Sequence, residues 1–566
     1  MLFINKIKTK RPFFEPSHMI SVFRSPGFFL FFRKNSYQSK KPYYITTPIF
    51  YINSDPHIGH LYTLVLADVI QRYQQLKDCQ TILRIGTDEH GIKECMPKTL
   101  QIQKAAIKSG LDPFLFCEKA SQRFKSLAKL ANISYKDFTR TTSLKHRQGV
   151  CHFWRVLEDK GYIYQSKHEG WYSVRDETFY PSSAVKNVQN PEDGTISTIS
   201  IETGANVEWV SENNYHFRLS IFKDHLLDHY EKNPTFIIPS SVQDFLYKTI
   251  SEGLSDISIS RPSSRYSWGI SVPGDDSHTI YVWFDALLSY ITNAGYPWNN
   301  STFGEWPADV HLIGKDIFRF HCILWPALLI AAKLPLPCQI VSHSHWTMNN
   351  IKMSKSLGNI VDPFVEIQKF TVDTLRYFLI KYGRLDNDRD YDSSDVIKNY
   401  DVDLRGQLGN LLLRILSPHF NLNRALLYAK KHTNENTFFQ DFDIKLNTIA
   451  ENVDNHMVSF RVHSALEAIF DFIRSINKFF QDFEPWKCKH DPSKLDPILF
   501  RALDAIRISG ILLKPFIPDK ASEILDQLDV EVSRRNLKFC KLGADDMYLR
   551  THYTQNKPLF PKLQSL

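Results

Sequence analysis

The feature that most constrains this chain is a short polar motif placed where an apolar run gives way to a helix. Residues 43–51, Tyr-Tyr-Ile-Thr-Thr-Pro-Ile-Phe-Tyr, have the composition of a buried β-strand. From Ile58 to Lys77, apolar side chains recur at near-helical spacing, with no proline and no glycine after Gly59. His57 and His60 are therefore predicted to stand at a strand-to-helix turn.

Such a turn favours an anion. The first backbone N–H groups of a helix have no partner within it, and the helix dipole is positive at this end. Imidazole N–H groups can donate to phosphate oxygens, and Gly59 lets a nucleotide approach the backbone closely. Taken alone, the motif is also compatible with two ordinary polar residues at a helix start.

A second motif occupies residues 352–359, Lys-Met-Ser-Lys-Ser-Leu-Gly-Asn. Its serine and glycine content predicts a mobile loop. Lys352 and Lys355 could close over a triphosphate and offset the charge that develops at the α-phosphorus. A solvated basic loop would have the same composition. Together and in this order, the two motifs predict a site that holds ATP and stabilises charge on its phosphates.

Several further motifs accompany these two, and their order is specific. They are Thr-Thr-Pro-Ile-Phe-Tyr at 46–51, Gly-Thr-Asp-Glu-His-Gly at 86–91, Tyr-Val-Trp-Phe-Asp-Ala at 281–286 and Gly-Lys-Asp-Ile at 314–317. With residues 352–359, they resemble the class I aminoacyl-tRNA synthetases, specifically methionyl-tRNA synthetases of the mitochondrial or bacterial type. The resemblance extends from about Lys41 to the C-terminus.

The resemblance implies a methionine–tRNA ligase that works in two steps. The methionine carboxylate attacks the α-phosphorus of ATP, which gives methionyl-adenylate and pyrophosphate. A ribose hydroxyl at the 3′ end of tRNA(Met) then attacks the acyl carbonyl. Mg²⁺ is expected to accompany ATP, and the protein contributes mainly positioning and electrostatic stabilisation.

By resemblance, the residues of the ATP site fall on the matching motif positions. The expected catalytic residues are His57, His60, Lys352 and Lys355. The expected ATP-binding residues are His57, Gly59, His60, Gly314, Asp316 and Lys355. An ionised aspartate such as Asp316 suits ribose hydroxyls because it only accepts hydrogen bonds.

The methionine pocket is carried over in the same way. Asp88 would pair with the α-ammonium group of the substrate. The residues expected to surround the side chain are Ile49, Tyr51, Trp283, Ala286, Tyr290 and His321. A thioether is polarisable and favours aromatic edges, so an aromatic box with few polar groups is a reasonable solution. Arg261 is expected near the active site. Without the family frame, core packing would be the better explanation for Trp283 and Tyr290.

The predicted fold is α/β: a doubly wound, Rossmann-type catalytic domain with an inserted connective domain, followed by an all-α anticodon-binding bundle. The alternation of strand-like and helix-like segments supports the first part, and short aromatic strands between polar turns support the insertion. The expected ranges are 1–40 for a transit peptide, 41–157 and 261–345 for the two catalytic halves, 158–260 for the insertion, 346–395 for the mobile-loop segment and 396–566 for the bundle.

The first 40 residues carry most of the net charge. They hold eight Lys/Arg and one acidic residue, Glu15, a net of +7, which leaves 8 − 7 = +1 for the rest of the chain. This composition fits a mitochondrial transit peptide, so we expect the mitochondrial matrix. A disordered basic tail is the alternative. Because the remaining net charge is small, tRNA affinity must come from local basic surfaces.

The eight cysteines are scattered, without a C-x-x-C pair, and the stretch Gly161–Trp209 has none. Many methionyl-tRNA synthetases carry zinc knuckles in this insertion, so we expect neither a structural zinc nor another protein-bound metal here. Stabilising disulfides are not expected either. No apolar run is long enough to span a bilayer, so no membrane partner is expected. We expect a monomer.

The C-terminal part is predicted to be helical, because one apolar stripe recurs at alternating steps of four and three from Val462 to Phe483. In the family this bundle reads the anticodon. Asn410 and Arg414 are four residues apart and share a helix face, and an aromatic such as Trp486 suits an unstacked base. The resemblance assigns all three to the anticodon; a solvated helix face is the alternative for the first two.

Two departures from the family pattern stand out. Residues Glu94–Leu100 form an extra stretch just after Asp88, and they are either a tolerated surface loop or an error in the predicted transcript. Ser344 replaces a more usual glycine. Synthetases for leucine, isoleucine and valine are longer because of an editing insertion, and the cysteine enzyme needs a zinc site. The remaining alternative is a non-catalytic tRNA-binding paralogue.

Overall fold

The computed structural model describes residues 41–52, 55–90, 112–173, 178–180, 182–189, 196–201, 203–264, 268–298, 303–353, 358–432, 437–549 and 558–563. These residues belong to one compact unit, which begins at Lys41. The predicted transit peptide, the extra stretch Glu94–Leu100 and Lys355 lie outside the described residues. No described helix has the length and apolar character needed to cross a membrane.

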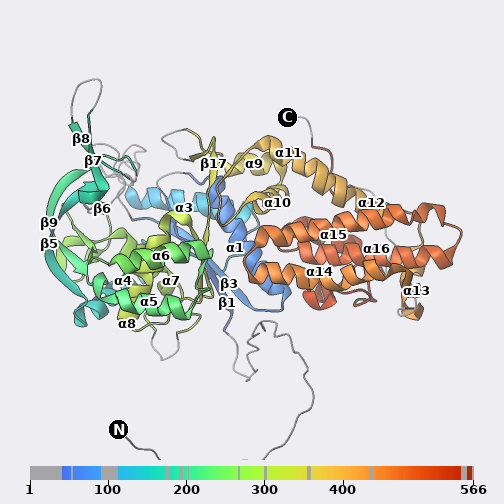
Figure 1. Cartoon of the computed structure of the whole chain (residues 1–566), viewed down its shortest axis with the longest axis horizontal. Coiled ribbons are helices and arrows are strands. Elements are labelled where there is room, and N and C mark those ends of the chain that lie inside the picture. The colour runs from blue at the N-terminus through green and yellow to red at the C-terminus, as the bar shows by residue number, and fades with distance from the viewer. Residues whose placement is uncertain are drawn as a thin grey trace, which may run out of the picture. The chain divides into compact units, whose positions relative to one another are not determined.

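A seven-stranded parallel sheet forms the centre of the catalytic part (Figure 1). β1 (Tyr43–Thr46) lies in the middle, and its two neighbours are β3 (Thr81–Asp88) and β15 (Val310–Gly314). β15 continues to β16 (Gln339–His343) and β10 (Ile237–Ile238), and β3 pairs with β2 (Phe50–Tyr51) and β4 (Asp137–Arg140). Successive connections thus leave β1 in opposite directions, which confirms the predicted doubly wound fold.

Helix α1 (Ile58–Leu76) follows β2 and lies against the sheet, as the apolar spacing predicted. Every residue from Leu61 to Ile70 is buried, although only part of a helix surface can face a sheet. The rest of its surface is covered by other helices, including α10 (Val372–Tyr382). The helix that starts at the histidine motif is therefore a central packing element as well as part of the site.

The inserted region contains a separate antiparallel sheet. Its longest pair is β5 (Ile163–Ser173) with β9 (Glu208–Phe217), and β7 (Val185–Gln189) forms a hairpin with β8 (Ile196–Ser200) (Figure 1). β10 lies within the range 158–260 that was expected for the insertion, yet it pairs with β16 of the central sheet. The domain ranges themselves stay predictions.

The C-terminal part is helical, as predicted. α14 (Gln440–Val458), α15 (Val462–Asp482) and α16 (Pro492–Leu513) pack on one another, and α13 (Leu422–His432) packs on α16 (Figure 1). The stripe on α15 is buried from Val462 to Phe480, because α15 has neighbours along its length. The stripe is therefore core, and the anticodon residues must lie elsewhere on the bundle.

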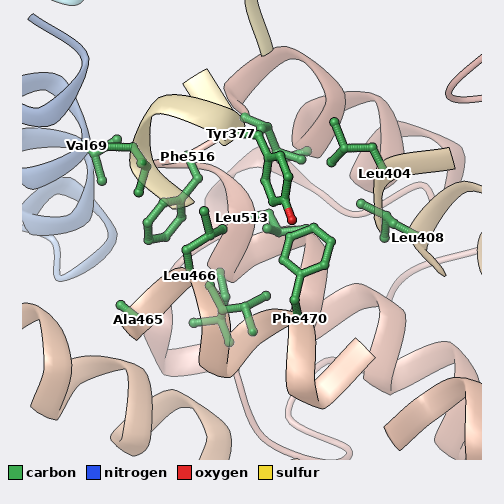
Figure 2. Close-up of a cluster of buried hydrophobic side chains, with 14 of the residues drawn as sticks. Val69, Tyr377, Leu404, Leu408, Ala465, Leu466, Phe470, Leu513 and Phe516 are labelled. Carbon is green, nitrogen blue, oxygen red and sulfur yellow. The ribbon is translucent and has the colours of Figure 1, made fainter. Parts of the chain in front are cut away.

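The catalytic part and the bundle share one hydrophobic core. Figure 2 shows a cluster of buried side chains from both parts of the chain. Val69 of α1 and Tyr377 of α10 lie there with Leu466 and Phe470 of α15 and with Phe516, which follows α16. The buried hydroxyl of Tyr377 donates a hydrogen bond to the buried carboxylate of Asp403, 2.7 Å away. Apolar packing therefore runs from the histidine-bearing helix into the bundle.

A buried ion pair lies inside this shared core. Asp68 of α1 accepts from Arg72 at 2.7 Å and from Arg376 of α10 at 2.6 Å, and both Asp68 and Arg376 are almost fully buried. Arg376 also donates to the carbonyl oxygens of Pro515 and Phe516, at the end of α16. Three elements are thus joined through one guanidinium.

Replacing Asp68 by asparagine should destabilise the chain strongly, because it leaves the charge of Arg376 buried and unpaired. The expected loss in the free energy of unfolding is roughly 3–5 kcal/mol, measured by urea denaturation. The control is Asp228→Asn, which removes the exposed partner of Lys232 and should cost less than about 1 kcal/mol. Equal losses for the two variants would contradict this role of Asp68.

Candidate active site

The predicted ATP residues gather at the carboxyl ends of β1 and β15. His57 and His60 begin α1 shortly after β1, and Gly314 is the last residue of β15. Because the chain leaves the two strands in opposite directions, their carboxyl ends lie at the topological switch point of the sheet. In open α/β sheets this is where ligands bind, so the fold places the motif at the expected edge.

His57 and His60 cap α1 reciprocally. The Nδ1 atom of His57 accepts from the backbone N–H of Gly59 at 3.1 Å, and Nδ1 of His60 accepts from the backbone N–H of His57 at 3.1 Å. The two rings lie 3.8 Å apart, centre to centre. Since both Nδ1 atoms accept, the hydrogen of each neutral ring is on Nε2. Both side chains therefore offer an Nε2–H donor.

Both imidazoles are held neutral. Burial lowers the pKa of His57 to about 4, with help from the charges of Lys352 and His345. Burial, with its neighbour His57, also holds the pKa of His60 well below the usual value. At physiological pH these residues are hydrogen-bond donors without net charge. Positive charge for a phosphate must come from lysines and from the helix start.

Lys352 lies in this site and pairs with Asp316. Its Nζ atom is 2.6 Å from Asp316 Oδ2, while His345 Nε2 is 3.1 Å from Oδ1. Partial desolvation by itself raises the pKa of Asp316, but the hydrogen bond from His345 and the charge of Lys352 outweigh it and hold the pKa below its usual range. A Cβ at Gly314 would lie 3.0 Å from Asp316 Oδ1, so the strand end leaves just enough room for this carboxylate.

Three residues without an assigned role support this arrangement. Asp388 accepts from the backbone N–H of His345 at 2.9 Å and from Lys315 Nζ at 2.8 Å. It therefore fixes the turn that carries His345, the partner of Asp316. Lys315 stands inside the Gly-Lys-Asp-Ile motif, which was its only signal in the sequence, while nothing local marks Asp388.

The predicted methionine-pocket residues Tyr290 and His321 are brought together. The Tyr290 hydroxyl lies 2.7 Å from His321 Nε2, and His321 Nδ1 lies 2.9 Å from the carbonyl oxygen of Ile317. A carbonyl only accepts, so His321 carries its hydrogen on Nδ1 and accepts from Tyr290. Burial lowers the pKa of His321 to about 4, which keeps the ring neutral.

Trp283, Ala286 and Tyr290 share one face of α7 (Val282–Asn293), since they stand three and four residues apart. The ring of Trp283 stacks on Phe320, with centres 4.0 Å apart and planes 8° apart. It also meets His321 edge-on at 6.1 Å. Phe320 was missed in the sequence, although it precedes His321 directly. The face of α7 is therefore an aromatic wall.

The remaining pocket residues lie at the end of β3 and beside it. Asp88 ends β3 and pairs in register with Tyr51 of β2. Ile49 contacts the same strand, where a Cβ at Gly86 would lie 3.0 Å from its methyl group. The guanidinium of Arg261 lies 4.9 Å from the ring centre of Tyr281, the residue that caps α7.

Two family models match this chain. The model of "tRNA synthetases class I (M)" matches residues 43–416, and that of the "anticodon binding domain of methionyl tRNA ligase" matches residues 429–552. The chain belongs to the class I methionyl-tRNA synthetases. The resemblance drawn from the five motifs is confirmed.

Known methionyl-tRNA synthetases match over most of their length. The probable mitochondrial methionine–tRNA ligase of Neurospora crassa is 44% identical over 92% of this chain and 85% of that protein. That of Schizosaccharomyces pombe is 44% identical over 93% and 97%. The structure of Mycobacterium tuberculosis methionyl-tRNA synthetase with methionyl-adenylate matches with a TM-score of 0.82 at 35% identity, covering 92% of this chain and 100% of that one. These relatives do not favour the non-catalytic alternative.

The three anticodon candidates of this synthetase meet on one side of the bundle. Asn410 is exposed at the start of α12 (Asn410–Ile415), and Arg414 lies one turn later in the same helix. The guanidinium of Arg414 lies 5.7 Å from the ring centre of Trp486 and 5.2 Å from that of Phe480. Trp486 is 36% exposed, which leaves part of its ring open to a base.

Metal ligands are not clustered in the part of the synthetase that the structure describes. No two cysteines of the described residues form a disulfide. The expectation of a zinc-free insertion stays a prediction. At the ATP site, His57 and His60 accept backbone N–H groups through Nδ1, and each oxygen of Asp316 has one side-chain partner.

The buried neutral histidines make stability depend on pH. Burial lowers the pKa of His343 to about 4, as for His321, while an unfolded histidine titrates near ~6.5. Between these values the unfolded state binds more protons, so the free energy of unfolding falls as the pH is lowered. The expected slope is up to ~1.4 kcal/mol per pH unit for each such histidine.

Thermal unfolding of wild type and His343→Gln, at pH 7 and at pH 5, measures this effect. The variant should lose less stability on acidification than wild type does. Asp373, whose pKa burial raises to about 6, acts in the opposite direction, but it is common to both chains and cancels in the comparison. Equal losses in the two chains would show that folding does not lower the pKa of His343.

Proposed function

We propose that this methionine–tRNA ligase forms methionyl-adenylate in the crevice at the carboxyl ends of β1, β3 and β15, with ATP on the His57 side and methionine on the Tyr290 side. The observation that carries the proposal is the meeting of His57, His60, Lys352 and Asp316 at the switch point of the sheet. His57 and His60 cap α1, and Lys352 and Asp316 come from two other parts of the sequence.

The phosphates of ATP are bound by donors already in place. Nε2–H groups of His57 and His60 donate to phosphate oxygens, and the start of α1 contributes its dipole. Lys352 and, by family resemblance, Lys355 supply positive charge that offsets the negative charge developing on the α-phosphoryl group. Asp316 keeps acceptor capacity beyond its bonds to His345 and Lys352, because a carboxylate has about four acceptor positions, so it binds a ribose hydroxyl beside Gly314.

Methionine is held at both ends. Asp88 accepts from the α-ammonium group, and the thioether lies against the aromatic wall of Trp283 and Tyr290. Ile49, Tyr51, Ala286 and His321 complete the enclosure. Because the Tyr290 hydroxyl and His321 satisfy each other, the pocket presents few unpaired polar groups to an apolar side chain.

Activation is an in-line displacement. A carboxylate oxygen of methionine forms a bond to the α-phosphorus, and the bond to the pyrophosphate oxygen breaks. Pyrophosphate leaves with the electron pair of that bond. This displacement needs no covalent intermediate with the enzyme. ATP enters as its Mg²⁺ complex, in which the metal offsets phosphate charge. The 3′-terminal ribose hydroxyl of tRNA(Met) then attacks the acyl carbonyl, and AMP leaves.

The bundle supplies tRNA recognition. Asn410 offers an amide that can hydrogen-bond a base edge, and Arg414 with Trp486 offers a stacking surface for an unpaired anticodon base. This separates recognition of the tRNA from the chemistry at the switch point. We further propose that the enzyme acts in the mitochondrial matrix; the names of its relatives support the mitochondrion. We also propose that it is a monomer.

Methionine-dependent ATP–pyrophosphate exchange on residues 41–566 tests the activation step. Lys352→Ala should lower the rate about a hundredfold, because it removes a charge that acts on the transition state. Lys398→Ala, an exposed lysine of α11 (Ser393–Asn399), is the control and should leave the rate unchanged. Exchange with other amino acids, or none with methionine, would overturn the assignment of the pocket.

Aminoacylation of tRNA tests the bundle. Trp486→Ala should lower kcat/KM for tRNA(Met) by about tenfold or more, since stacking of a base is worth ~1–3 kcal/mol. The rate of ATP–pyrophosphate exchange should not change. Phe438→Ala, which removes an aromatic ring that is 73% exposed in the same bundle, is the matched control. A loss of exchange in the Trp486 variant would instead indicate damage to the fold.

A further inference from the structure

A buried carboxylate lies behind the methionine pocket, between two imidazoles. Asp285 of α7 is 1% exposed, and its two oxygens have different partners: Oδ2 lies 2.6 Å from His90 Nδ1 and Oδ1 lies 2.6 Å from His146 Nε2. Both histidines are also buried. A single charge in the apolar stretch 281–286 signals such a partner, because an unpaired buried carboxylate is costly. The motif was recognised without a role for Asp285.

The cluster shares α7 with the pocket, on the other side of the helix. Trp283 and Tyr290 are seven residues apart and line one face. Asp285 and Thr292 are also seven residues apart, and they stand two positions further along, which is about 200° round the helix. One face of α7 therefore receives methionine, while the opposite face carries the carboxylate that holds the imidazoles.

On that opposite face, α7 is anchored to α4 (Leu144–Asp159). His146 of α4 contacts Asp285 through Nε2 and the Thr292 hydroxyl through Nδ1, at 2.8 Å. The two helices approach closely because position 149 is glycine: a Cβ on Gly149 would collide with the Thr292 methyl group. The carboxylate of Asp285 is thus held from one side by a rigid helix contact.

His90 connects the carboxylate to the ammonium-binding residue. Its backbone N–H donates to Asp88 Oδ1 at 3.1 Å, two residues earlier in the chain. The ring of His90 and this N–H belong to the same residue, so the contact of the ring with Asp285 fixes the side-chain rotamer and restrains the backbone that carries the N–H. The position of the Asp88 carboxylate is therefore coupled to α7, which also carries the pocket wall.

We propose that Asp285 is a positioning residue for methionine, which sets the Asp88 carboxylate at the correct separation from the pocket face of α7 by holding His90 against the fixed His146. This inference rests on the proposed binding of the α-ammonium group by Asp88. Asp285 itself does not touch the substrate. Its effect is confined to ligands that carry an α-ammonium group.

Binding of two ligands to the full chain, by titration calorimetry, tests this role. The first is methionine, and the second is 4-(methylthio)butanoate, which has the same thioether and carboxylate but no amino group. Asp285→Asn should raise the Kd of methionine about tenfold or more, the size expected when a charged hydrogen bond is misplaced. The Kd of the desamino ligand should stay within about threefold.

Two further variants make the result specific. Asp373→Asn, a buried carboxylate on α10 away from the pocket, should leave both dissociation constants unchanged. In the double variant Asp88→Asn with Asp285→Asn, the methionine Kd should match that of Asp88→Asn alone, because the second change then has nothing to position. Additive losses, or equal weakening of both ligands by Asp285→Asn, would overturn the proposal in favour of a general packing role.

The same experiment separates this role from the proposed function. Absence of ATP–pyrophosphate exchange in a wild-type chain that binds methionine would count against the proposed activation step. The ratio of the two dissociation constants judges Asp285 independently of turnover. A ratio unchanged by Asp285→Asn would overturn the positioning role and leave the ligase assignment intact.

Discussion

The buried carboxylate of Asp68 is the interaction on which the arrangement of this chain depends. It lies in the middle of α1, the helix that starts with the histidine motif, and it binds Arg376 of α10, whose guanidinium also contacts the backbone just after α16. A buried ion pair contributes little net stability, but its geometry is demanding, because every remaining donor needs an acceptor. Here the carbonyl oxygens of Pro515 and Phe516 supply them.

The consequence is that α1 serves three regions. Its first residues face the crevice, its middle is tied to the shared core, and Tyr73 and Lys77 near its end both contact Asp454 of α14. The Rossmann-type domain and the bundle are thus joined by charge pairs as well as by apolar packing. Contacts that hold the bundle are carried by the same rigid element as the histidines.

At the two halves of the site, burial keeps the imidazoles of His57, His60 and His321 neutral. The carboxylate of Asp316 is kept ionised by its partners. Burial lowers the pKa of His57 and His321 to about 4. Burial by itself raises the pKa of Asp285, but its two histidine partners outweigh this and lower it to about 2. Neutral donors, with the charge of the exposed Lys352 added from β18 (Ile351–Lys352), allow a tetra-anionic substrate to bind without a permanently charged and buried cluster.

Sequence periodicity and motifs predicted much of this molecule. The helix from Ile58, the buried stripe on α15 and the histidines at a strand-to-helix turn all follow from local spacing, and the family resemblance supplied the fold class. Local spacing was silent on β10, a two-residue strand that joins the central sheet. It was also silent on the Asp285–His90 contact, whose partners are 195 residues apart.

By itself, the sequence determined the family, the fold class and the long helices of the chain, and it supplied the candidate residues for the chemistry, because these depend on residue type and short-range spacing. Only the tertiary structure decided which nitrogen of each histidine bears the hydrogen, that Lys352 pairs with Asp316, and that Asp285 lies behind the methionine pocket. The reason is physical: protonation and hydrogen-bond roles depend on burial and on neighbours that are distant in sequence, and folding alone brings those groups together.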